Sequence, residues 1–241
     1  MKSPISGIDL GIYPRALLLL VRNPSIILLP LLTTLLGVLM ARVLSPGEYG
    51  LAGITSGLGG LIVQLIELFG VGVACVMADD AWRHGRSSFE NDWPEAQRRG
   101  GEMLVAAIGI TLIQAVAQYA GLLLGTILSL LLIAAATYFL IWTIPAAAVG
   151  GIPGGAAIQV SIDRVRANPL PAAIATVVTV VVAFVLPALF TAWLLGAEFP
   201  FLATIPLVAS LIGALVQAIG LSYVALIITK TYTDAAFTRR W

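Results

Sequence analysis

The chain has 241 residues, of which 59% are hydrophobic and only 10% are charged. A soluble domain usually has about 25% charged residues, so this composition excludes an ordinary soluble globule and indicates an integral membrane protein. Thirteen Lys and Arg residues against twelve Asp and Glu residues give a net charge of +1. Because this charge produces no strong overall field, we expect no nucleic-acid partner.

Hydropathy predicts an all-α, polytopic membrane protein with one transmembrane domain over residues 1–241. Six segments each reach the roughly 20 residues that a helix needs to cross a bilayer. The third and fourth are separated only around Gly121 to Gly125, so we expect a very tight hairpin there. The six predicted spans are about 24–44, 53–78, 102–123, 125–148, 169–195 and 201–229.

The basic residues predict the orientation of these spans. If the N-terminus is cytoplasmic, Arg42 is the one basic residue on the outer side, which is the asymmetry expected of a membrane protein. An even number of spans then places both termini in the cytoplasm. The basic residues on the cytoplasmic side would be Lys2, Arg15, Arg22, Arg83, Arg86, Arg98, Arg99, Arg164, Arg166, Lys230, Arg239 and Arg240.

A short, basic, amphipathic segment precedes each odd-numbered span. Arg22-Asn23-Pro24 and Asn168-Pro169 end two of these segments alike, with an Asn suited to the N-cap and a Pro suited to the first turn of the next helix. We therefore predict three elbow-plus-hairpin units, at about 8–78, 87–148 and 156–230, each an interfacial helix followed by two spans. The alternative is that the elbows are not related, and that they look alike only because basic residues concentrate on the cytoplasmic side of membrane proteins.

Polar and small residues follow one face of several spans at spacings of three and four. Such faces point toward neighbouring helices rather than lipid, because amide side chains prefer a polar partner to hydrocarbon. We expect the second, third and sixth spans to bring five polar side chains close together, although the spacing does not determine which helices touch. These side chains are Gln64, Glu67, Gln114, Gln118 and Gln217.

Glu67 is the most informative residue of this group because it lies near the middle of its span. An unpaired charge at that depth costs several kcal/mol, and no Lys, Arg or His lies at comparable depth. We expect a neutral carboxyl group that is hydrogen-bonded to a glutamine. Glu67 would then either bind a proton, a cation or a lipid headgroup, or simply link two helices.

Basic and aromatic residues at the predicted cytoplasmic surface are candidates for contacts with lipid headgroups or partner proteins. They lie in the elbows, in the polar segment 79–101 and at the C-terminus. These residues are Arg15, Arg22, Trp82, Arg83, Trp93, Arg98, Arg99, Arg164, Arg166, Arg239, Arg240 and Trp241.

No catalytic or metal site is predicted, and we expect no cofactor. Asp79 and Asp80, with Asp92 further on, could hold Mg²⁺ against a phosphate, but they also fit the exit of a span into water. The single histidine, His84, excludes multi-histidine sites, and no nucleophile motif or phosphate loop is present. The single cysteine, Cys75, excludes an intrachain disulfide.

Several short motifs resemble a known family. They are Tyr13-Pro14-Arg15-Ala16 with Arg22-Asn23-Pro24, then Ala78-Asp79-Asp80, Gly85-Arg86 and Phe89, then Arg164 with Asn168-Pro169, and finally Tyr232-Thr233-Asp234. In this pattern the chain resembles the six-helix bacterial membrane domain that occurs alone or fused to glycerophosphodiester phosphodiesterases. The resemblance implies a bacterial inner-membrane protein without an activity of its own, and it carries over no catalytic residues.

These features together predict a non-catalytic, multi-pass inner-membrane protein. Its expected role is that of an accessory or scaffold subunit, with membrane lipids and other membrane proteins as partners. The alternative is a small permease or a lipid-handling transporter that uses the Glu67 and glutamine residues.

Overall fold

The computed structural model describes residues 9–43, 52–196 and 206–237, and within these ranges the chain is helical and contains no strand. Five helical segments are long and apolar enough to cross a membrane, or six if a bent pair at the N-terminal end counts as one. This confirms the predicted all-α class for the described part of the chain. The spans are compatible with a multi-pass membrane protein.

The helices follow one another with short connections, and a single residue, Gly125, joins α5 to α6. In chain order they are α1 (Ile12–Arg22), the 3₁₀ turn η1 (Pro24–Ile27), α2 (Leu28–Val43), α3 (Ala52–His84), α4 (Phe89–Arg98), α5 (Gly100–Leu124), α6 (Thr126–Leu140), α7 (Thr143–Ala148), α8 (Gly154–Ala167), α9 (Pro169–Val180), the π-helical turn η2 (Val181–Val185), α10 (Leu186–Gly196) and α12 (Pro206–Phe237).

Two helices extend beyond their predicted spans. Helix α3 continues to His84 and α12 to Phe237. Hydropathy detects only the apolar part of a helix, and these two helices continue into polar sequence. The predicted span 125–148 is divided at Ile141 and Trp142 into α6 and α7. Pro206 is the first residue of α12, where its missing N–H has no cost.

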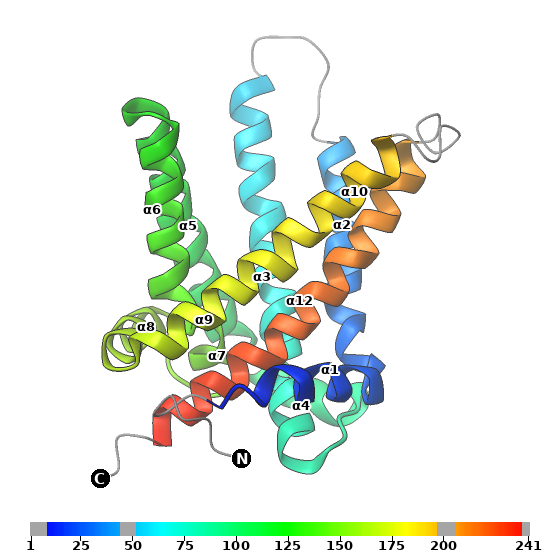
Figure 1. Ribbon diagram of the computed structural model, residues 1–241, viewed down its shortest axis with the longest axis vertical. Coiled ribbons are helices and arrows are strands. Elements are labelled where there is room, and N and C mark those ends of the chain that lie inside the picture. The colour runs from blue at the N-terminus through cyan, green and yellow to red at the C-terminus, as the bar shows by residue number, and fades with distance from the viewer. Residues whose placement is uncertain (1–8, 44–51, 197–205, 238–241) are drawn as a thin grey trace.

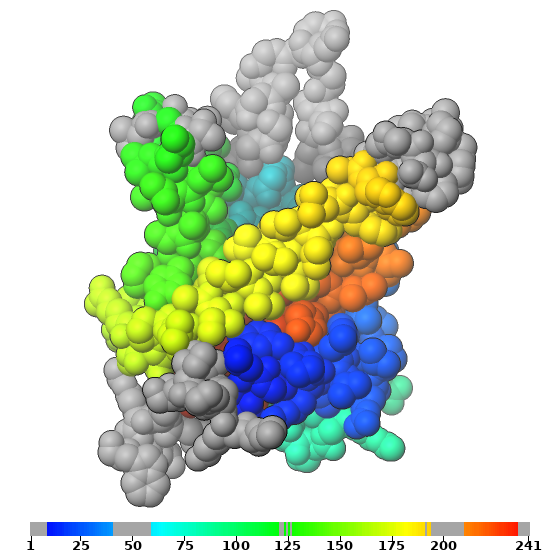
Figure 2. Space-filling model, viewed as in Figure 1, coloured from blue at the N-terminus to red at the C-terminus, as the bar shows by residue number. Residues whose placement is uncertain are grey.

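Helices α2, α3 and α12 pack against one another as the central group, and α5 to α8 form a second group on the other side of α3 (Figure 1). The continuous segment α9–η2–α10 crosses diagonally over α12 and forms a ridge on the face seen in Figure 2. Helix α12 is the most buried candidate span. In its most apolar stretch 56% of the residues are buried inside the protein, compared with 22% in that of the α9–α10 segment. The central group therefore contains most of the core.

The contact between α12 and the π-helical turn requires a glycine. A Cβ atom on Gly220 would lie 2.5 Å from the carbonyl oxygen of Val182, so any larger residue would force the two helices apart. Pro187 follows this turn and cannot donate to the carbonyl of Ala183, and its ring would clash there in a regular helix. The wider π turn accommodates the proline while keeping the helix continuous.

Three short helices, α1, α4 and α8, each precede a longer helix. Helix α1 meets the segment Pro24–Met40 at an angle of 92°. Asn23 and Asn168 adopt nearly the same backbone angles at the ends of α1 and α8, with φ of −128° and −134° and ψ of 67° and 63°. The two elbows therefore share one backbone geometry, whereas α4 ends differently at Arg99.

The two asparagines do not act as the predicted N-caps, because neither side chain bonds to the helix that follows. Each donates back to the helix before it, Asn23 to the Leu19 carbonyl at 2.9 Å and Asn168 to the Arg164 carbonyl at 3.2 Å. Asn23 also accepts from the Ser87 backbone N–H at 2.8 Å. This buried amide therefore ties the first elbow to the connection between α3 and α4.

Replacing Asn23 should consequently destabilise the protein more than replacing Asn168. We expect Asn23→Ala to cost about 1–3 kcal/mol, because it leaves the buried Ser87 N–H without its acceptor, and Asn168→Ala to cost about 1 kcal/mol. Thermal unfolding of both variants in the same detergent measures the difference. Equal losses would show that the long-range bond of Asn23 contributes nothing beyond its local one.

Candidate functional site

The predicted polar side chains inside the spans form two hydrogen-bonded pairs along α3. Gln64 donates from its Nε2 to the Oε1 of Gln114 on α5. Three residues further along α3, the carboxyl oxygens of Glu67 accept from the Nε2 of Gln217 on α12, at 3.3 and 3.5 Å. The pairs thus link α3 to a different neighbour on each side, and α3 is the helix they share.

The helix α2 completes the surroundings of Glu67. A Cβ atom on Gly37 would lie 3.7 Å from the Glu67 Oε1, an ordinary contact distance, so α2 passes close to this carboxyl group. Thr34, one turn earlier, donates to the Ala214 carbonyl of α12 at 3.3 Å. The carboxyl group of Glu67 therefore lies where α2, α3 and α12 meet, and all four paired side chains are partly buried.

Gln118 is separate from both pairs. Its side chain is exposed on α5 and makes no hydrogen bond with any described residue. The neighbouring exposed side chains of α5 are largely apolar, with Leu112 at 58%, Val116 at 69% and Tyr119 at 54% exposure. An amide is thus presented on a surface that otherwise has the character of a lipid-facing helix.

A second group of polar residues lines a cavity of about 250 Å³ between the end of α3, α4 and the end of α7. Acidic and basic side chains form three contacts there. Arg83 bonds to Asp79 at 2.7 Å, His84 to Asp80 at 2.7 Å, and Arg99 to Glu95 at 2.6 Å. The acidic groups that could have held Mg²⁺ are instead paired with basic side chains.

Asp92 is the exception in this charged cavity. It is 8% exposed, and its Oδ2 is buried and accepts no hydrogen bond from the described residues. Burial, followed by the nearby carboxylate of Asp80, raises the pKa of Asp92 from 3.8 to about 6. In the described part of the chain, no three His, Cys, Asp or Glu side chains are arranged to hold a metal ion.

Three residues predicted to contact headgroups or partners donate to backbone carbonyls of other helices. Trp82 donates from its indole Nε1 to the Leu226 carbonyl of α12 at 2.9 Å. Arg99 donates to the carbonyls of Ala148 and Val149 at 2.9 and 2.5 Å, and so satisfies the C-terminal end of α7. A cation at a helix C-terminus is also favoured by the helix dipole.

Arg164 lies with its guanidinium carbon 3.8 Å from the centre of the Tyr232 ring and donates to the Tyr232 carbonyl at 3.2 Å. It therefore attaches α8 to the end of α12.

The other predicted contact residues are more exposed. Arg15 pairs with Asp9 at 3.4 Å, and Arg98 pairs with Glu95 at 3.5 Å. Trp93 is partly buried and stacks on Phe89, with 5.1 Å between the ring centres. Arg22 and Arg166 are exposed, and Arg239, Arg240 and Trp241 lie outside the described residues. Headgroup contact by these residues stays a prediction.

One buried polar junction was not predicted. Trp142 is fully buried at the break between α6 and α7, and its indole Nε1 donates to the Thr231 hydroxyl of α12 at 3.0 Å. The Ser161 hydroxyl of α8 accepts from the Trp142 backbone N–H and donates to the Phe139 carbonyl. A lone Trp inside an apolar run was the one sequence signal for this junction, because an indole N–H needs a buried partner.

The paired geometry predicts that Glu67→Gln keeps the stability of the protein, because the amide oxygen can still accept from Gln217. Glu67→Leu removes the acceptor, and we expect it to lower the free energy of unfolding by about 0.6 to 1.7 kcal/mol. Thermal unfolding in detergent compares the two variants. A loss in Glu67→Gln as large as that in Glu67→Leu would mean that the carboxyl group, rather than the helix link, is required.

The raised pKa of Asp92 predicts a pH dependence of stability. Folding favours the protonated carboxyl group, so the contribution of Asp92 is greatest below pH 4 and is lost as the pH rises through about 6. Asp92→Asn should remove this fall in unfolding temperature, while Glu90→Gln on the exposed side of α4 should keep it. His84 and Asp80 remain in both variants, so unfolding curves from pH 4 to 8 isolate Asp92. Parallel curves for wild type and Asp92→Asn would contradict the assignment.

Compared with protein-family models, with curated proteins and with solved structures, the chain shows no match in any of the three. The resemblance to the six-helix bacterial membrane domain therefore stays a prediction. The features of the chain that bear on its function are the two partly buried pairs, the exposed Gln118 and the charged cavity.

Proposed function

We propose that the chain is a non-catalytic, multi-pass protein of the bacterial cytoplasmic membrane that serves as an accessory or scaffold subunit for other membrane proteins. The observation that carries this proposal is the exposed Gln118. A primary amide in hydrocarbon loses its hydrogen bonds to water, which is unfavourable unless another polar group replaces them. Six residues separate Gln118 from the end of α5 at Leu124, or roughly 9 Å at 1.5 Å per residue, so it lies within the apolar layer.

The proposed topology has six spans in three elbow-plus-hairpin units, with both termini in the cytoplasm. Helix α1 supports an elbow lying in the membrane surface, since it turns by 92° before the first span and leaves Leu17, Leu18 and Val21 at 55–75% exposure. The shared geometry of Asn23 and Asn168 supports a common origin of the first and third units. Figure 1 places α1, α4 and α8 at one end, where their basic residues favour the cytoplasmic side.

The two buried pairs support a structural use of the polar face. Glu67 and Gln217 join α3 to α12, and Gln64 and Gln114 join α3 to α5, so each of these side chains has a partner on a neighbouring helix. A transport path would instead need polar groups turned toward water or substrate. The exposed apolar ridge of α9–α10 offers further surface for lipid or partner helices, with Val177, Phe184 and Leu189 at 57–62% exposure.

An accessory role predicts a partner protein of fixed stoichiometry that depends on Gln118. The test is native mass spectrometry of the protein extracted from its native membrane in mild detergent. We expect wild type and the matched control Leu112→Ile, an exposed position on the same helix, to retain the partner. Gln118→Leu should weaken the binding of the partner about three- to eighteenfold, since a lost interhelical hydrogen bond costs about 0.6–1.7 kcal/mol.

Two other results would contradict the proposal. A lone wild-type chain that retains a defined solute would favour the permease or lipid-handling alternative. An oligomer of this chain alone, lost in Gln118→Leu, would show that Gln118 faces a second copy rather than a different protein.

A further inference from the structure

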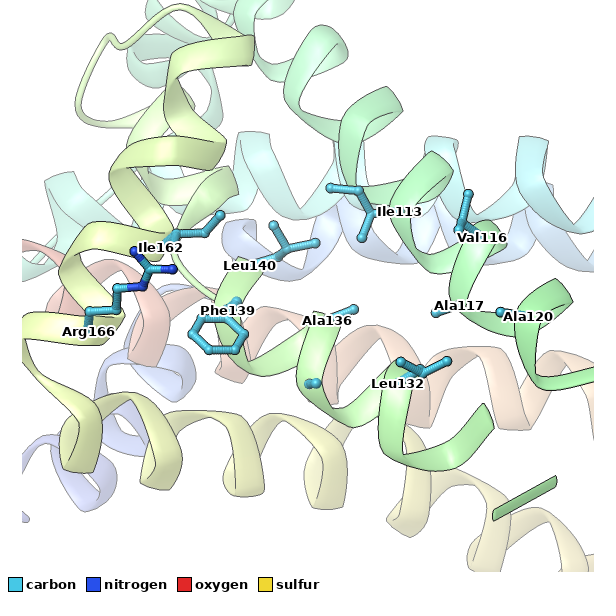
Figure 3. A pocket seen from close by; sticks show the side chains of 11 residues that line it. Ile113, Val116, Ala117, Ala120, Leu132, Ala136, Phe139, Leu140, Ile162 and Arg166 are labelled. Atoms are coloured by element: carbon cyan, nitrogen blue, oxygen red, sulfur yellow. The ribbon is translucent and has the colours of Figure 1, made fainter. Parts of the chain in front are cut away.

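A separate apolar cavity of about 500 Å³ lies against α5, α6 and α8 (Figure 3). Aliphatic and aromatic side chains line it, and Arg166 is the one charged residue of the lining. In the figure Arg166 is at the α8 end, while Val116 and Ala120 mark the opposite end on α5. The lining residues are Ile113, Val116, Ala117, Ala120, Leu132, Ala135, Ala136, Phe139, Leu140, Ile162 and Arg166.

Arg166 differs from its neighbour Arg164 in having no hydrogen-bond or ion-pair partner among the described residues. Arg164 is held by Tyr232, whereas Arg166 is exposed and makes no ion pair with any described residue. The nearest acid on the same helix face, Asp163, accepts instead from Gln159 at 3.2 Å. A guanidinium group presents a planar fork of donors that fits phosphate oxygens. The cavity therefore has an apolar body and a free cation at one end.

The length of the cavity fits an acyl chain. The lining of α6 runs from Leu132 to Leu140, or roughly 12 Å at 1.5 Å per residue, slightly less than half of a hydrocarbon layer of about 30 Å. This length is close to the depth of one leaflet, which is the depth that an acyl chain occupies.

The position of Arg166 also fits a lipid headgroup. It is two residues before Asn168, where the short helix α8 ends and the candidate span α9 begins at Pro169. Such a junction lies at the level of the headgroups when the following helix crosses the bilayer, and long basic side chains concentrate there. The cavity then extends from that level into the apolar layer beside α5 and α6.

We propose that this cavity binds one anionic phospholipid, with its phosphate on the Arg166 guanidinium and one acyl chain between α5 and α6. The proposal rests on the membrane location given under the proposed function, and it adds a specific ligand class and site. The guanidinium group at one end and the apolar lining of the cavity distinguish this site from the general lipid contact of exposed helices.

The test is native mass spectrometry of the full chain reconstituted in lipid discs containing equal amounts of phosphatidylglycerol and phosphatidylcholine. We expect wild type to retain one phosphatidylglycerol, and Arg166→Gln to reduce this retention at least fivefold. Arg166→Lys keeps the charge but loses the planar fork of donors, so its retention should lie between those of wild type and Arg166→Gln. The matched control, Arg86→Gln, removes an exposed arginine away from the cavity and should leave retention unchanged.

A second variant tests the apolar part of the cavity. Ala135 lies on the exposed rim, so Ala135→Trp should fill the cavity without disturbing the core, and we expect it to abolish retention while the unfolding temperature stays the same. Equal retention in wild type and Arg166→Gln would overturn the proposal, as would full retention in Ala135→Trp. Binding of palmitate, but not of phosphatidylglycerol, in the same assay would show that the occupant is a fatty acid and would overturn it too.

The experiment separates this inference from the accessory role. A protein that retains the lipid but no second polypeptide contradicts the subunit role and leaves the lipid site intact. A protein that retains a partner but binds no lipid through Arg166 contradicts the lipid site alone. A chain that does not enter lipid discs contradicts the membrane location and both proposals.

Discussion

The packing of α12 against α2 and α3 is the contact on which the rest of the structure depends. An apolar helix in lipid gains little by burying more hydrocarbon, so such helices associate through close approach and hydrogen bonds between them. Both are present here. The hydroxyl of Ser222 lies 3.4 Å from the Ile26 carbonyl, Thr34 reaches Ala214, and Gln217 reaches Glu67. Gly220 then lets the α9–α10 segment approach the other side of α12.

The need to satisfy backbone carbonyls explains several contacts at the charged end of the molecule. Short helices leave unpaired carbonyls at their C-termini, and the chain satisfies them with side chains from other helices. Arg99 does this for α7, and Trp82 and Arg164 bond to backbone carbonyls of α12. Asp92 has no such partner on its Oδ2 among the described residues, and its raised pKa predicts that this end loses stability as the pH rises.

Much of the fold could be predicted from the sequence, because hydropathy and helical spacing are local properties. The five or six apolar helices and the polar face of α3 were predicted in this way. The choice of partners was not, since Gln114, Gln118 and Gln217 are chemically alike and only the arrangement in space pairs two of them. Likewise, Arg and Trp side chains suit headgroups and backbone carbonyls alike, so the contacts of Trp82 and Arg99 within the chain could not be predicted from their residue types. Asn23 was predicted as a cap, but its main partner is 64 residues away.

The long separation between contacting segments also has a consequence for biosynthesis. Gln217 follows Glu67 by 150 residues, and chains are made at roughly 5–20 residues per second, so Glu67 is synthesised about 8–30 s before its partner. During that interval its carboxyl group has no Gln217 beside it. The core formed by α2, α3 and α12 is therefore completed only after the last helix has been made.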